Sequence, residues 1–109
     1  MVIKQAKWLG GRGMSLWPFG IYVKRFDYAD FTKLVNHEKI HWEQQKELPV
    51  VFYVLYGLEW FVNLFKYGKR AYINISFEQE AYDNDQIYNY LSYRKRFASF
   101  RYLRYKPVK

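Results

Sequence analysis

The sequence of 109 residues has no cysteine, which excludes a disulfide framework, a cysteine-ligated zinc finger and a thiol nucleophile. It also has no internal repeat and no low-complexity stretch, so we expect a single domain over residues 1–109. No apolar run of signal-peptide length occurs between Met1 and Gly10. We therefore expect a cytoplasmic protein, with membrane association as the alternative.

Acidic residues are few: the chain has 10 Asp and Glu and 18 Lys and Arg. Its net charge is +8 when both histidines are neutral. Aromatic residues are abundant at 23% of the chain, and half of all residues are hydrophobic. Disordered chains contain few aromatic residues, so this composition predicts a folded domain with an apolar core.

Short β-forming runs and turn signals alternate over residues 2–25. The glycines at positions 10, 11 and 13 mark a turn, and Pro18 and Gly20 interrupt the runs that follow it. Apolar residues at helical spacing begin near Asp30. The sequence therefore predicts an α+β fold, mainly α, with a small N-terminal β-hairpin or meander followed by three or four helices.

The first helix is predicted to begin with Asp27 or Asp30 as its N-cap and to stop by Leu48, because Pro49 disfavours helical geometry in the residue before it. A second helix is predicted from Pro49 to a close at Gly68. Its first part, residues 49–65, is almost wholly apolar and nearly long enough to span a bilayer. The length rule favours a helix buried against the domain, and a helix embedded in or lying on a membrane is the alternative.

A third helix is predicted from Ser76, a hydroxyl cap followed by Glu78 and Glu80 in the first turn, and it continues toward Leu91. The tail over residues 93–105 is also helical in propensity and strongly basic. The prediction is thus a mostly helical chain after residue 25, with its acids placed early in the third helix.

One motif carries recognisable chemistry, the H-E-x-x-H pattern His37-Glu38-Lys39-Ile40-His41 inside the first predicted helix. Positions i and i+4 lie one above the other on a helix, so both imidazoles can bind one metal ion. Zn²⁺ lowers the pKa of a bound water toward about 7, and a carboxylate within reach can accept its proton. Glu38 is therefore predicted to be the general base of a hydrolase and to pass the proton on to a leaving amine.

The third metal ligand must be a carboxylate, because the chain has no third histidine. Glu78 and Glu80 open a separate helix, and Ala81 is small enough to let that helix approach the first one closely. Glu59 is the other candidate, since a lone carboxylate on an apolar helix is costly unless it is paired or bound to a metal. We favour Glu78, and keep Glu80 and Glu59 as alternative ligands or as acceptors for a ligand histidine.

The motif layout resembles the gluzincin peptidases, in which a glutamate in a Glu-x-x-(Ala/Ser)-Asp pattern is the third zinc ligand. The matching segment here reads Glu78-Gln79-Glu80-Ala81-Tyr82. The resemblance implies Zn²⁺ held by His37, His41 and Glu78. Tyr82 stands where the family has Asp, which puts the usual support of a motif histidine in doubt.

A larger part of the chain is similar to a family of small, uncharacterised bacterial proteins with an H-E-x-x-H motif. The segments that carry this likeness are VNHEKIHWEQQKEL, YVLYGLEWF and NISFEQEAYDN. The likeness implies a zincin-like domain and no particular substrate.

A peptidase also needs a donor for the oxyanion of its transition state. We select Tyr82 as the candidate oxyanion donor and keep Tyr72 and Arg70 as further candidates. The alternative for each is an ordinary packing or surface residue. The residues before Lys24 can supply an edge strand for an extended peptide.

The tail over residues 94–109 mixes aromatic rings with cations and holds no acid; its basic residues are Arg94, Lys95, Arg96, Arg101, Arg104, Lys106 and Lys109. This mixture suits an anionic membrane surface. It also suits stacking and phosphate contact on nucleic acid. The alternative is a helix that packs Phe97, Phe100 and Leu103 inward.

The sequence thus predicts a zinc metallopeptidase, or a related hydrolase, that acts on a peptide or protein substrate. Two alternatives remain open. The chain can be a non-catalytic basic module that binds a membrane surface or nucleic acid, or a small fold held together by a structural metal.

Overall fold

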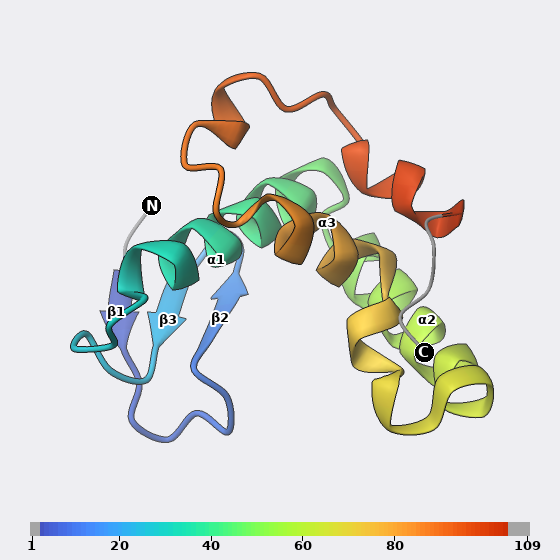
Figure 1. The fold of residues 1–109 in the computed structure, drawn as a ribbon, viewed down its shortest axis with the longest axis horizontal. Coiled ribbons are helices and arrows are strands. Elements are labelled where there is room, and N and C mark those ends of the chain that lie inside the picture. The colour runs from blue at the N-terminus through green and yellow to red at the C-terminus, as the bar shows by residue number, and fades with distance from the viewer. Residues whose placement is uncertain (1–2, 105–109) are drawn as a thin grey trace.

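The computed structural model describes residues 3–104, in which a three-stranded sheet precedes three α-helices (Figure 1). The strands are β1 (Ile3–Gln5), β2 (Gly13–Leu16) and β3 (Gly20–Val23). The helices are α1 (Phe31–Glu47), α2 (Val51–Tyr67) and α3 (Ser76–Asn84). Short 3₁₀ helices cover Gly68–Arg70, Tyr72–Asn74, Tyr90–Ser92 and Ala98–Arg104. This is the mainly helical α+β fold that the sequence predicts.

The sheet has the strand order β1-β3-β2. β2 and β3 form the predicted hairpin, with Ser15 opposite Ile21 in antiparallel pairing. β1 runs parallel to β3 and pairs Lys4 with Tyr22, so it lies across β3 from β2. β2 is therefore an edge strand of this sheet. Its outer edge is bound by Gln45 of α1, whose side-chain oxygen accepts from the N–H of Trp17 and whose side-chain nitrogen donates to the carbonyl of Ser15, both at 2.7 Å. The expected edge strand exists, but this part of it is already occupied.

α1 begins and ends where the sequence predicts, after Asp30 and before Leu48. Asp30 occupies the N-cap position but makes no capping bond, because its carboxylate pairs with the guanidinium of Arg12. Asp27, the other predicted cap, pairs with Arg25 instead. The prediction of Asp30 as the N-cap residue is therefore confirmed, but the expected hydrogen bond from its side chain to the helix N-terminus is not formed.

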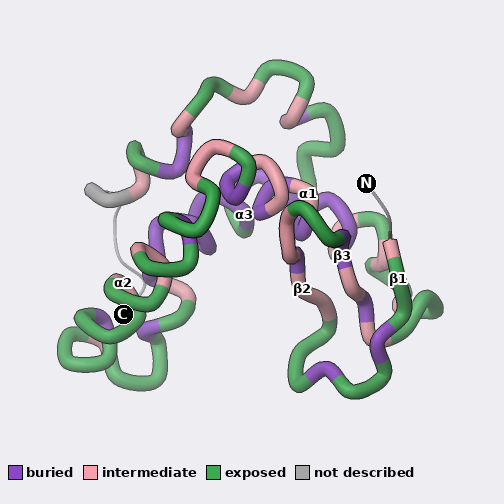
Figure 2. Tube along the Cα trace, turned by 180° about the vertical axis from the view of Figure 1, so that it is seen from behind, coloured by how far each residue is buried: buried purple, intermediate pink, exposed green. Residues whose placement is uncertain are grey.

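α2 starts after Val50, which adopts a left-handed conformation with φ of 65° where the chain turns from α1 into α2. It ends at Gly68, whose φ of 58° is easy for glycine. The predicted burial of this apolar helix is wrong, because only Phe52 and Asn63 are buried along its length. Figure 2 shows most of α2 exposed.

α3 packs against α1 through Ala81 and Ile40, both fully buried, as the small side chain of Ala81 predicts. Ser76 is the first residue of α3 rather than its cap, and the carboxylate of Glu59 accepts hydrogen bonds from its backbone N–H at 2.9 Å and its hydroxyl at 2.8 Å.

The predicted continuation of α3 to Leu91 is wrong, since the helix ends at Asn84. The side-chain amide of Asn36 donates to the backbone carbonyls of Asn84, Asp85 and Ile87. These carbonyls lie where a longer helix would need them for its own hydrogen bonds. The side chain that precedes the H-E-x-x-H motif therefore shapes the turn after α3.

The C-terminal segment is held by Arg94, whose side chain is 4% exposed in ion pairs with Glu47 and Glu80. Ala98 and Ser99 are buried, whereas Phe100 is 40% exposed. The expected inward packing of Phe100 and the expected solvation of Arg94 are therefore wrong, whereas Arg96 and Arg101 are exposed as expected. The rest of the basic tail, residues 105–109, lies outside the described residues.

Within residues 3–104, no single helix is long and apolar enough to cross a membrane. Phe31–Glu47 and Val51–Arg70 meet the length and composition criteria only when taken together, and they are bent by 114° at the break between them.

Candidate metal centre

The structure brings His37, His41 and Glu78 together, as the sequence predicts. The Nε2 atoms of His37 and His41 both lie 3.1 Å from Oε1 of Glu78. All three side chains are buried, and their ligand atoms lie within 4.8 Å of one another. In a tetrahedral zinc site with bonds near 2.1 Å, neighbouring ligand atoms are about 3.4 Å apart. The spacing therefore fits one ion.

Each motif histidine is oriented by a hydrogen bond from its other ring nitrogen. Nδ1 of His37 lies 3.1 Å from Oδ2 of Asp85, and Nδ1 of His41 lies 2.7 Å from Oε1 of Gln44. A carboxylate oxygen and an amide oxygen only accept hydrogen bonds, so both Nδ1 atoms carry the proton. Both Nε2 atoms are consequently the ones free to bind a metal.

This arrangement requires a positive charge between the rings and the carboxylate. If His37 and His41 are neutral and protonated on Nδ1, the lone pairs of both Nε2 atoms point at Oε1 of Glu78. These lone pairs and the carboxylate oxygen repel one another. An added proton or a metal ion removes the repulsion. Burial lowers the pKa of His41, but the Glu78 carboxylate outweighs it and raises the pKa to about 9. The donor set of two imidazoles and one carboxylate suits Zn²⁺.

Glu78 is held so that one oxygen faces the histidines. The hydroxyl of Tyr56 donates to Oε2 of Glu78 at 2.7 Å, which leaves Oε1 directed at the two rings. Burial raises the pKa of Glu78, but the neighbouring imidazoles outweigh it and hold the pKa well below its usual value. Glu78 is therefore ionised and preorganised as a ligand.

The two alternative ligands have other roles. Glu59 lies on α2 and caps α3 through Ser76. Glu80 is fully buried and accepts hydrogen bonds from Tyr90, Arg94 and Gln44. It therefore reaches His41 only through Gln44. Neither belongs to the cluster of possible metal ligands found in the described residues.

Glu38 lies beside the three candidate ligands and lines two cavities. It is 5% exposed, and burial raises the pKa of its carboxyl group above the usual value. It packs against Gly13 of β2, where a Cβ atom would lie 3.4 Å from Cγ of Glu38, at ordinary van der Waals contact. The motif glutamate is thus held close to the candidate site and faces open space.

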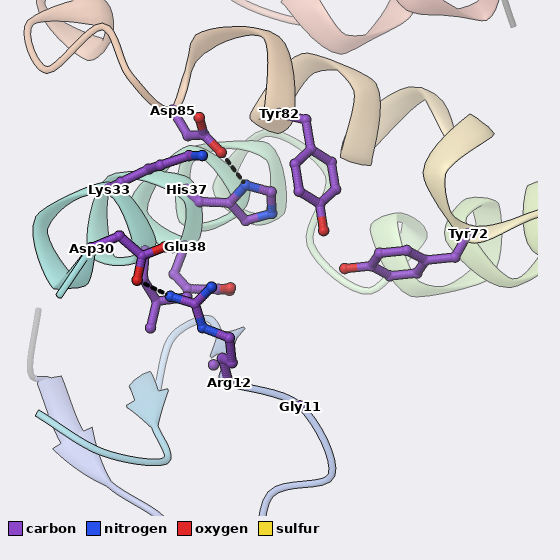
Figure 3. A pocket seen from close by; sticks show the side chains of 11 residues that line it. Gly11, Arg12, Asp30, Lys33, His37, Glu38, Tyr72, Tyr82 and Asp85 are labelled. Atoms are coloured by element: carbon purple, nitrogen blue, oxygen red, sulfur yellow. Dashed lines mark hydrogen bonds and ion pairs between the residues drawn. The ribbon is translucent and has the colours of Figure 1, made fainter. Parts of the chain in front are cut away.

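The first cavity has a volume of about 430 Å³, and the charged residues Arg12, Lys33 and Asp85 are part of its lining (Figure 3). Tyr82 lies at its edge with its ring centroid 4.5 Å from that of His37. In Figure 3 the hydroxyl groups of Tyr82 and Tyr72 point toward each other beside His37. The structure therefore places both predicted oxyanion donors at the site. Arg70, the third candidate, does not line either cavity.

The second cavity, of about 410 Å³, lies between β2 and α2. His41, Glu38 and Glu78 line its inner part. Its other lining residues are mostly apolar or aromatic, among them Met14, Leu16, Phe52, Tyr53, Tyr56 and Trp60. The candidate metal site thus lies between a cavity lined by several charged residues and a mainly apolar one.

Three supporting residues were missed from the sequence. Gln44 had a readable signal, since it lies three residues after His41 and so shares its helix face. Asp85 follows the end of α3 in a turn, and Tyr56 comes from another helix, so no periodic pattern marks either one. Asp85 is the residue that accepts the hydrogen bond from Nδ1 of His37.

Comparisons of this chain with protein-family models, with curated proteins and with solved structures find no match. The resemblance to gluzincins therefore stays a prediction, and the function must be inferred from the geometry of the site.

Proposed function

We propose that this protein is a zinc-dependent hydrolase that cleaves peptide or amide bonds, with His37, His41 and Glu78 as metal ligands. One observation carries the proposal. The three ligand atoms converge, with both histidines oriented for metal binding, beside a carboxylate that faces two cavities. A zinc ion held there supplies a Lewis acid that acidifies water and polarises a carbonyl group.

Glu38 acts as the general base and then as the general acid. Its carboxylate accepts a proton from the attacking water and delivers it to the nitrogen of the leaving amine. A carboxyl group with a raised pKa is a better proton acceptor than an exposed one, and the burial of Glu38 has this effect.

Tyr82 and Tyr72 stabilise the negative charge that develops on the carbonyl oxygen. Burial raises the pKa of both hydroxyl groups, and the nearby Glu78 carboxylate adds to the effect. Both therefore stay protonated at neutral pH and can donate hydrogen bonds.

The substrate we propose is an extended peptide. It lies along β2 and α2 through its side chains, because Gln45 already binds the backbone groups of Ser15 and Trp17 at the outer edge of β2. An apolar or aromatic side chain of such a peptide fits the cavity lined by Tyr53 and Trp60.

A structural metal is the competing proposal for the same three residues. Structural zinc sites are closed by four protein ligands, whereas catalytic sites keep one position open. The described residues supply three ligands at this site, and Glu38 beside them lines cavities, which favours the hydrolase.

The test is hydrolysis of a mixture of unstructured peptides by zinc-loaded protein, followed by mass spectrometry. Glu38→Gln should keep the metal and the fold but lower turnover by a factor of about 10² to 10⁴. The matched control is Glu43→Gln on the same helix, where Glu43 is partly exposed and paired with Lys46. Undiminished turnover in Glu38→Gln would show that Glu38 is not the general base. A metal-loaded protein that cleaves no peptide would support the structural metal site instead.

A further inference from the structure

α2 presents an apolar surface that no described residue covers. The residues of this surface are Val51, Val54, Leu58, Phe61, Val62 and Phe65, each about half-exposed or more, up to 80% for Phe65. They recur at helical spacing along one side of α2, which Figure 2 shows as exposed. Monomeric proteins rarely expose an apolar patch that covers a whole helix, so this outer face indicates an interaction surface.

The polar side chains of α2 face away from this outer face. Glu59 bonds to the start of α3 through Ser76, and the amide of Asn63 donates to the backbone carbonyl of Ala71 at 3.2 Å. Glu59 and Asn63, whose polar groups would be costly in lipid, thus make their hydrogen bonds within the protein. The outer face itself carries no charge.

Cations lie at the C-terminal end of the outer face. Lys66, Lys69 and Arg70 are all exposed, and no acid occurs between Trp60 and Phe77. A patch of this kind is complementary to anionic lipid headgroups, which attract basic residues near an apolar anchor. A second copy of the chain is disfavoured as the occupant, because each copy carries a net charge of +8.

The length of α2 indicates how it meets the lipid. Its 17 residues extend about 25 Å, which is shorter than the roughly 30 Å hydrocarbon core of a bilayer. One side of the helix is bonded to the protein, so only the outer face is free to insert. Half-exposed Trp60 and Tyr53 lie on the same helix, and these residue types favour the membrane interface.

From these observations we infer that α2 docks the protein in the plane of an anionic phospholipid surface through its outer face, with Lys66, Lys69 and Arg70 on the headgroups. Tyr53, Gly57 and Trp60 of the same helix also line the apolar cavity at the candidate metal centre. Docking therefore brings this cavity next to the lipid surface.

The test is flotation of the full chain with vesicles of phosphatidylcholine, with and without phosphatidylglycerol. The wild type should bind the vesicles that contain phosphatidylglycerol, and salt should weaken the binding. The double variant Phe61→Glu/Phe65→Glu should lose at least about tenfold in affinity, because it places charges in the inserted face. Trp8→Glu is the matched control in the loop between β1 and β2, across the molecule from α2 (Figure 1), and should bind as the wild type does.

A second pair of variants locates the cationic contact. Replacing Lys66, Lys69 and Arg70 together by alanine should weaken binding about fivefold per charge on anionic vesicles. The control replaces the exposed Lys95 and Arg96 of the C-terminal segment and should change little. Loss of binding in the control alone overturns the proposal in favour of the tail. Absence of vesicle binding, with a dimer in sedimentation that Phe61→Glu/Phe65→Glu dissociates, overturns it in favour of a second copy.

Discussion

α1 and α2 have the same length of 17 residues and opposite relations to solvent. α1 is polar in composition, yet it buries Asn36, His37, Glu38, His41, Gln44 and Gln45. α2 is apolar, yet it buries only Phe52 and Asn63. The usual preference of apolar residues for the interior is thus inverted between two helices that follow each other in the chain.

The inversion means that the interior beside α1 holds polar side chains where an apolar face is the usual solution. A buried polar group destabilises a protein unless it finds a hydrogen-bond partner. In the α1–α3 interface each motif histidine has two partners, and Gln44 links His41 to Glu80. The interior therefore holds a polar network at a candidate metal site, and the apolar helix remains available for lipid.

Breaking the polar network at its far end should have the largest effect on stability. Arg94→Ala leaves the buried carboxylate of Glu80 and the largely buried carboxylate of Glu47 without their cation, so the free energy of unfolding should fall by about 3–5 kcal/mol. Urea denaturation followed by circular dichroism measures this loss. Lys95→Ala, at the exposed neighbouring residue, is the control and should change the free energy by less than about 0.5 kcal/mol. A loss below about 1 kcal/mol for Arg94→Ala would show that the network contributes little.

The metal-free protein should lose stability as the pH rises. The folded-state pKa of His41 is about 9 against 6.5 for the free side chain, so its contribution is complete below pH 6.5 and is lost as the pH rises to about 9. The loss is on the order of 3 kcal/mol. Urea denaturation of chelator-treated protein across this range measures it. Zn²⁺ should abolish the dependence, because it replaces the proton, and a flat profile without metal would contradict the predicted coupling of His41 with Glu78.

Removing the partner of His37 should weaken metal binding without removing a ligand. Asp85→Ala should lower zinc affinity about 10- to 100-fold, because the ring of His37 loses the acceptor that orients it. Competition with a chromogenic chelator gives the affinity. Asp83→Ala, two residues earlier at an exposed position, is the control. Equal affinities for the two variants would show that Asp85 does not support the site.

Changing the apolar surface should have the smallest effect on the isolated protein. Phe65→Ser should alter the free energy of unfolding by no more than about 0.5 kcal/mol in the absence of lipid, because Phe65 is 80% exposed. Ile40→Ala, a large-to-small change in the buried α1–α3 contact, should cost about 2–5 kcal/mol. The same urea titration compares both variants. A comparable loss for Phe65→Ser would mean that α2 is packed in the native protein.

The sequence predicts the parts of this structure that depend on local spacing. The four-residue interval between His37 and His41 places both rings on one helix face, and Gly68 marks the end of α2. Glu78 and Glu80 are two residues apart, so they point to different sides of α3 and only one of them can face the histidines. The small size of Ala81 is consistent with its close contact with Ile40.

The sequence does not predict the features that depend on contacts between distant segments. The end of α3 is set by Asn36, and the cap of α3 comes from Glu59 of another helix. The exposure of α2 follows from packing that buries the polar face of α1 instead, which no rule of apolar periodicity anticipates. Asp85 acts from an irregular turn, where spacing carries no information.

The metal site itself can be measured by titrating Zn²⁺ into metal-free wild type, Glu78→Ala and Glu80→Gln, with the affinity obtained by chelator competition. We expect one tightly bound ion per chain in the wild type, a similar affinity in Glu80→Gln, and a loss of more than about 100-fold in Glu78→Ala. Binding by Glu78→Ala that equals the wild type, or no binding by the wild type, would contradict this expectation.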